Sequence, residues 1–128
     1  WTAPDYELEI EGKIPSKKNL YHPSKNGKGM FKIGKVVNAE KMFALQIPGE
    51  MIGLNLENPH IMIEMQMPKK SWRSDRDNAA TMILDCLVKS AVLKDDSINK
   101  CNGILVLLPV VECSDYKCKI RMWKNKNV

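Results

Sequence analysis

The hydrophobic pattern between residues 61 and 111 changes its period twice, and this constrains the fold more than any other feature of the sequence. Apolar residues alternate with other residues over 61–67, which predicts a half-buried strand. Over 78–91 they recur every three or four positions, which predicts a helix with one apolar face. A nearly unbroken apolar run at 104–111 then predicts a central strand covered on both faces.

Two further segments alternate, one near each end of the chain. In 6–14, apolar residues alternate with three glutamates, and in 116–123 they alternate with two lysines and an arginine. Both patterns predict strands with one buried face, and the second strand has a basic face.

A hairpin is predicted between the first strand and the first helix. Asn26-Gly27 is a strong turn signal, and it lies between short strand candidates at 20–22 and 30–37. Lysines gather here, so a long hairpin or basic flap is expected; they are Lys17, Lys18, Lys25, Lys28, Lys32 and Lys35.

The first helix is expected to begin at Ala39, where Asn38 can act as the N-cap, and to be broken at Pro48-Gly49. The element order is then strand, hairpin, helix, strand, helix, strand, strand. We therefore expect one domain, 1–128, with an α+β (mixed α/β) fold: a mixed sheet with about two helices.

Composition adds limits on the partner and the compartment. The 128 residues carry a net charge of +5, which favours a polyanionic partner. Of the four cysteines, Cys113 and Cys118 could form half of a zinc site, but no second half follows, so reduced thiols in a cytoplasmic protein are expected. No apolar run reaches the length of a membrane helix and no signal peptide is visible, so no membrane partner is expected.

Four carboxylates form two tight clusters within this basic chain. Asp75 and Asp77 are two residues apart, and Asp95 and Asp96 follow about twenty residues later. On an extended segment, side chains at i and i+2 point to the same side, with Cα atoms about 7 Å apart. A third carboxylate would complete an oxygen-rich site of the kind that Mg²⁺ prefers.

Three segments resemble the RusA family of Holliday junction resolvases, which are small endonucleases of bacteria and phages. Residues 14–21 (IPSKKNLY) are similar to the opening motif of that family. Residues 75–78 (DRDN), followed by 83–87 (ILDCL), resemble its aspartate-x-aspartate-asparagine element and the helix after it. Residues 92–96 (VLKDD) resemble its paired-aspartate turn. The resemblance spans nearly the whole chain.

The resemblance implies a homodimeric, Mg²⁺-dependent crossover junction endodeoxyribonuclease, bacterial or phage-encoded and cytoplasmic, that cuts four-way DNA by paired incisions. Mn²⁺ is expected to substitute for Mg²⁺, and no small-molecule cofactor is expected. The catalytic and metal-binding aspartates of the family fall on Asp75, Asp77 and Asp96. The residues expected to contact DNA are Lys17, Lys18, Asn19, Lys69, Lys70, Arg73 and Arg76.

The sequence departs from the family at one catalytic position. The family lysine, four residues after the second aspartate, is Thr81 here. A lysine one helical turn on could lean back toward the helix start and reach the scissile phosphate, and threonine cannot supply that charge. Either a neighbouring basic residue replaces it, or activity is reduced, or the protein binds junctions without cutting them.

Simpler interpretations of the carboxylates stay open. Asp75 and Asp77 could cap the following helix and bind no metal. The chain would then be a basic structural protein and not an enzyme. Asp95 fits a solvated turn, since adjacent residues of an extended segment point in opposite directions. Because the predicted helix is about 20 Å long, Asp96 reaches its start either through a tight return of the chain or in a second subunit.

Overall fold

The computed structural model of the chain describes residues 2–14, 21–23, 30–32, 34–68, 72–94 and 103–125. For 21–23, 30–32, 35–36 and 72–78 it describes the backbone alone.

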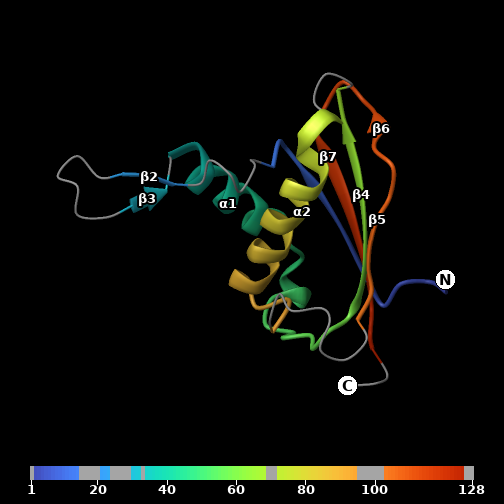
Figure 1. Ribbon diagram of the computed structural model, residues 1–128. Helices are drawn as coiled ribbons and strands as arrows, with labels where there is room; N and C mark the ends of the chain where they lie inside the picture. The colour runs from blue at the N-terminus through green and yellow to red at the C-terminus, as the bar shows by residue number, and fades with distance from the viewer. Residues whose placement is uncertain are drawn as a thin grey trace.

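The main sheet has five strands, and its two central strands are far apart in the sequence (Figure 1). The spatial order is β1 (Tyr6–Glu11), β7 (Lys117–Trp123), β4 (His60–Met67) and β5 (Leu105–Leu107), with β6 (Val111–Glu112) also pairing with β4. The β1–β7 and β7–β4 pairs are antiparallel, and β5 and β6 run parallel to β4. The expected single-domain α+β fold with a mixed sheet is therefore confirmed.

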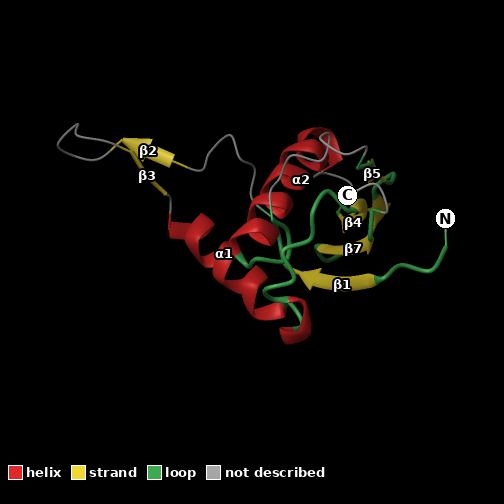
Figure 2. Cartoon of the chain, turned by 90° about the horizontal axis from the view of Figure 1, so that it is seen from below, coloured by secondary structure: helices red, strands yellow, loops and turns green. Residues whose placement is uncertain are grey.

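The helices cover one face of this sheet, as Figure 2 shows. They are α1 (Gly34–Gln46), the short 3-10 helix η2 (Gly49–Met51) and α2 (Trp72–Lys89). Helix α2 lies between β4 and its parallel neighbour β5 in the sequence. The chain therefore runs back along the sheet through α2 before it enters β5 (Figure 1).

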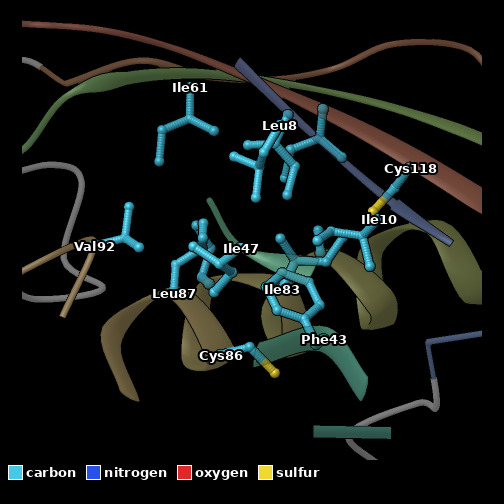
Figure 3. Close-up of a cluster of buried hydrophobic side chains, with 14 of the residues drawn as sticks. Leu8, Ile10, Phe43, Ile47, Ile61, Ile83, Cys86, Leu87, Val92 and Cys118 are labelled. Atoms are coloured by element: carbon cyan, nitrogen blue, oxygen red, sulfur yellow. The ribbon is translucent and has the colours of Figure 1, made fainter. Parts of the chain in front are cut away.

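The core lies between the sheet and the helices (Figure 3). Each alternating strand buries its apolar side, as predicted for 6–14, 61–67 and 116–123. Among the largest fully buried side chains are Ile10, Ile61 and Ile120 from the sheet, and Phe43 and Ile83 from the helices.

Two polar contacts join helix α1 to the rest of the fold, in addition to the packing of Phe43 in the core. The Gln46 side-chain amide accepts a hydrogen bond from the Glu11 N–H (2.7 Å) and donates one to the Glu11 carbonyl (2.9 Å). In the middle of α1, Glu40 forms an ion pair with Lys89 at the end of α2. These contacts link α1 to both β1 and α2.

The predicted hairpin is confirmed, but its second strand is shorter than expected. Strands β2 (Tyr21–Pro23) and β3 (Met30–Lys32) pair antiparallel, and the hairpin projects away from the main sheet (Figures 1 and 2). Helix α1 begins at Gly34, so residues 34–37 are helical and Asn38 lies inside the helix. The prediction of an N-cap at Asn38 was wrong, because the helix takes in the residues before this cap candidate.

Helix α2 begins at Trp72, six residues before the predicted start at 78. At its other end, Ala91 has φ 56, and the Val92 and Ala91 N–H groups donate to the Leu87 and Val88 carbonyls. This is the Schellman arrangement, in which a left-handed residue ends a helix. The chain then turns alongside Leu56, which bridges to Leu93.

The apolar run at 104–111 was predicted to be a central strand covered on both faces, and this was wrong. It forms β5 and β6 beside β4 at the end of the described sheet order, and no residue of the run is fully buried. Ile104 is 49% exposed, Leu105 37% and Val111 47%. Composition alone cannot tell a covered strand from an edge strand that nothing covers in a single chain.

The face of the sheet opposite the helices carries charges that alternate across the strands. Glu7, Glu9 and Glu11 of β1 lie opposite the basic residues of β7 in the strand register. Arg121 lies 3.1 Å from Glu7 and 3.6 Å from Glu64 of β4, measured between nitrogen and carboxylate oxygen. The basic face predicted for the last strand is present, but the neighbouring glutamates neutralise it.

Candidate functional site

Asp75 and Asp77 lie in the first half of α2, directly after the segment that leaves β4. The expectation that they share an extended segment was wrong, because the backbone there is helical. Residues two apart on a helix are separated by about 200° around its axis, so they are not neighbours on one face. Oxygen ligands suit Mg²⁺, but the helical backbone does not by itself direct both carboxylates to one ion.

The start of α2 at Trp72 also changes the capping interpretation. An N-cap residue precedes the first helical residue, and both Asp75 and Asp77 lie within the helix. Neither one is therefore the N-cap of α2. Asp75 lies in the first turn of α2, where the helix dipole favours a negative charge.

Thr81 lies one helical turn after Asp77 on α2, as expected, and it is half-buried. Positions i and i+4 share a helix face, so Thr81 occupies the place from which the family lysine would lean toward the helix start. Asp85 follows one turn later and is also half-buried.

Asp96 lies outside the described residues, which end at Lys94 and resume at Gly103, but the chain that leads toward it is placed. The Leu93 N–H donates to the Leu87 carbonyl (3.3 Å), and the Lys94 N–H donates to the Leu56 carbonyl (3.0 Å). This is the C-terminal end of α2, whereas Asp75 lies near the N-terminal end of a helix that is about 27 Å long. Within one chain, Asp96 would therefore have to return along α2 from its end at Lys89 to reach Asp75.

Lys94 carries its own acidic partner at this end of the helix. Its ammonium lies 2.6 Å from a Glu57 carboxylate oxygen, and this hydrogen bond raises the pKa of Lys94 above its usual value. The ammonium therefore stays charged at neutral pH.

The residues expected to contact DNA mostly fall outside the described part of the chain. These are Lys17, Lys18, Asn19, Lys69 and Lys70; Arg73 and Arg76 lie on α2, with only their backbone described. The residues whose side chains are described include eight basic and eleven acidic ones, a net charge of −3. The residues whose side chains are not described include twelve basic and four acidic ones, a net charge of +8. Together with the −3 of the described side chains, this gives the net charge of +5 of the whole chain.

A small cavity lies beside α2, close to its start. Its volume is about 20 Å³, and it is lined by Gly12, Lys13, Ile14, Met65, Gln66, Met67, Ala79, Tyr116, Lys117 and Cys118. This volume suits a water molecule and is far below that of a small-molecule site. Burial raises the pKa of the Cys118 thiol to about 12, so this thiol stays protonated at neutral pH.

Two basic residues near this cavity were not among the sequence-based candidates. The Lys13 ammonium lies 5.5 Å from the centre of the Tyr116 ring, and Lys117 lies 3.8 Å from a Glu11 carboxylate oxygen. Lys13 follows β1 and Lys117 begins β7, and these strand ends meet only through the sheet pairing. The alternation of the two strands predicted which faces are buried but not that these ends are adjacent.

No three His, Cys, Asp or Glu side chains come together as a metal site among the residues whose side chains are described. No protein-family model matches the sequence, and no curated protein matches it. Within the described ranges, no helix combines the length and apolar character needed to cross a membrane.

Proposed function

We propose that this chain is a Mg²⁺-dependent, structure-specific endodeoxyribonuclease that resolves four-way DNA junctions by paired strand incision in recombination and repair. The observation that carries the proposal is the acidic motif at 75–78, at the start of the helix that follows a central strand of a mixed sheet. Its order relative to residues 14–21 and 92–96 resembles that in the RusA family.

The distribution of charge supports a polyanionic substrate. The described side chains are acidic overall, so the positive excess belongs mainly to the lysines around the hairpin and to the basic residues at the start of α2. Basic residues in these segments would hold phosphates, with an affinity that falls steeply as salt rises. A homodimer would supply two sites for the two strands that a pseudo-symmetric junction presents.

Asp75, Asp77 and Asp96 would hold the metal ion, because carboxylate oxygens are the ligands that Mg²⁺ prefers. The bound ion would supply Lewis-acid stabilisation of the phosphate and a water of lowered pKa. The part of this chain is to bind the DNA backbone through its basic residues and to place the carboxylates beside it. Since Asp75 and Asp77 are two apart on a helix, their separate contributions need to be measured one at a time.

The test is incision of a synthetic four-way junction with and without Mg²⁺. We expect the wild type to cut, and both Asp75→Asn and Asp77→Asn to lose at least about a hundredfold in rate. Asp85→Asn is the matched control, because it removes a carboxylate from the same helix outside the proposed set, and it should keep its activity. Equal cutting by the wild type and Asp77→Asn would remove the metal-site proposal.

Thr81 favours a second candidate function, a junction-binding protein on the same scaffold that does not cut. This candidate predicts tight binding of the junction without Mg²⁺-stimulated incision. Thr81→Lys restores the charge expected at this position and should then raise the incision rate from the background. If the wild type already cuts rapidly and Thr81→Lys adds nothing, this second candidate is excluded.

A purely structural role for the carboxylates makes a different prediction. Asp75→Asn would then lower the melting temperature and leave the binding of Mn²⁺, followed by calorimetry, unchanged. Loss of a Mn²⁺ site at unchanged melting temperature would argue for the metal role.

A further inference from the structure

The β5 edge of the main sheet, defined here as residues 104–107, is apolar, and no strand among the described residues pairs with its outer side. Ile104 and Leu105 are 49% and 37% exposed, although the run they belong to has the composition of a strand covered on both faces. Natural sheets protect free edges with charged residues, proline or bulges, because an open edge can pair with another chain.

Protection of this kind is present beyond Leu107 but not before it. Three residues lie between Leu107 and Val111, whereas two lie between their partners Ile63 and Gln66 on β4, so the edge carries a bulge there. The bulge includes Pro109, which has no N–H to offer. Residues 101–111 contain no charged side chain, so 104–107 have neither a charge nor a proline.

The backbone groups of this edge alternate between β4 and the open side. The Ile104 carbonyl accepts from the Ile61 N–H (2.8 Å), and the Leu108 N–H donates to the Ile63 carbonyl (3.0 Å). The even-numbered residues therefore bond to β4. By the alternation of a strand, the N–H and C=O groups of Leu105 and Leu107 point away from the sheet.

We infer that a second copy of this chain pairs antiparallel with β5 about a two-fold axis at Val106, which joins the two sheets into one. In this register Leu105 lies opposite Leu107 of the second copy, so all four outward-pointing N–H and C=O groups find partners. A contact through one two-fold axis uses the same surface on both subunits and closes the assembly at a dimer.

The charges that flank the run favour this occupant and this direction. In the sequence the uncharged run follows Lys100, which lies outside the described residues, and is followed by Glu112. Antiparallel pairing brings the start of the run in one copy toward its end in the other, so the opposite charges that flank the run in the sequence favour this direction. A parallel arrangement would bring like charges together, which is unfavourable across a sheet.

The inference rests on the proposed function in one respect, since the homodimer is part of that proposal. Antiparallel pairing brings the Gly103 end of one edge beside the Val111 end of the other. Val111 pairs with Gln66 near the end of β4, and the chain leaves β4 toward the start of α2. The C-terminal end of α2 in one copy therefore comes closer to the N-terminal end of α2 in the other copy than the two ends are within one chain.

Sedimentation velocity of the full chain without DNA or metal tests the interface. We expect a wild-type mass of twice 14.6 kDa. Leu105→Pro removes an outward N–H from each copy, so two hydrogen bonds are lost and the dimer Kd should rise by about tenfold or more. Ile104→Lys places a charge on the edge without altering the backbone, so it decides the question if the proline variant does not fold.

The control is Leu45→Lys on α1, because Leu45 is 79% exposed and lies away from the β5 edge. It should leave the dimer intact. A wild-type monomer, or a dimer disrupted by Leu45→Lys and kept by Ile104→Lys, would overturn the inference. Since no DNA and no incision enter this measurement, an inactive dimer would count against the nuclease proposal alone, and an active monomer against the interface alone.

Discussion

Along β1 every residue whose backbone faces outward is a glutamate, whereas along β5 every such residue is a leucine. The Gly12 N–H donates to the Tyr116 carbonyl (2.9 Å), so the even-numbered residues of β1 bond to β7 and the odd-numbered ones face outward. Glu11 also has its outward N–H and C=O bonded by the Gln46 amide. One edge of the sheet is thus protected by charged residues and by a side chain of α1, whereas no strand of the described residues pairs with the outer side of the other.

The difference indicates that the β1 edge is protected against pairing with another chain, whereas the β5 edge is suited to it. Charged edge residues keep other chains from pairing, at little cost to the fold. An uncharged edge exposes apolar surface that is unfavourable in water unless it is covered. The predictions that follow vary the inner and outer positions of the sheet to test this contrast.

The largest effect is expected when proline replaces residues of β5 that face in opposite directions. Val106→Pro removes an N–H that bonds to β4 and should lower the free energy of unfolding by about 2–3 kcal/mol, because a β4 carbonyl loses its donor. Leu105→Pro removes an outward N–H and should cost about 1 kcal/mol or less in the monomer. Urea unfolding at low protein concentration measures both. Equal losses would show that the backbone of β5 does not alternate as described.

A smaller effect is expected from alkaline pH at the closed side of the sheet, where Cys118 pairs with Ile10. Burial raises the pKa of this thiol from 9.0 to about 12. The unfolded chain therefore loses this proton first, and stability falls as pH rises from about 9 toward 12. Between pH 9 and pH 10 the wild type should lose about 1 kcal/mol more than Cys118→Ala does.

The matched control is Cys113→Ala, since Cys113 is only half-buried after β6 at the open side. It should keep the wild-type dependence on pH. If the free energy of unfolding of Cys118→Ala fell with pH as steeply as that of the wild type, other groups would be the cause of the loss of stability at alkaline pH.

The smallest effect is expected from the charges of the β1 edge. Glu7→Gln removes one partner of Arg121 but leaves Glu64 at 3.6 Å, so the free energy of unfolding should fall by about 0.5 kcal/mol or less. The loss should shrink as salt is added, since the pair is partly exposed. Thermal unfolding at low and high salt measures it, with Glu50→Gln on η2 as the control. A loss of several kcal/mol would mean that the edge charges hold the fold together.

The strands with strict alternation were predicted well from the sequence, because one buried face imposes a period of two. Leu8 and Ile10 of β1, and Cys118 and Ile120 of β7, are buried as expected. The failures came where composition is compatible with two structures. An apolar run such as 104–111 has the same composition whether its own chain or a second copy covers it. Likewise, the residue type of Asn38 is compatible with a position before a helix and with one inside it.

The candidate site was predicted less completely than the fold. The sequence identified Asp75, Asp77 and Thr81, and all three lie on α2, although Asp75 and Asp77 were expected on an extended segment before the helix. The predicted extended geometry of the two aspartates was wrong because the helix begins at Trp72. The hydrophobic pattern of the sequence gives no signal for a start at this residue. The closeness of Lys13 and Tyr116 depends on the pairing of the first and last strands of the main sheet, which no local pattern encodes.

The two polar contacts of α1 are unevenly placed along the helix. A helix of thirteen residues is a rod about 20 Å long, and this one is fastened at its far end by Gln46 and at its middle by Glu40. The β2–β3 hairpin stands beyond the other end of the rod (Figure 1). The polar contacts that hold α1 on β1 and α2 therefore lie in the middle and at the far end of the helix, away from the hairpin.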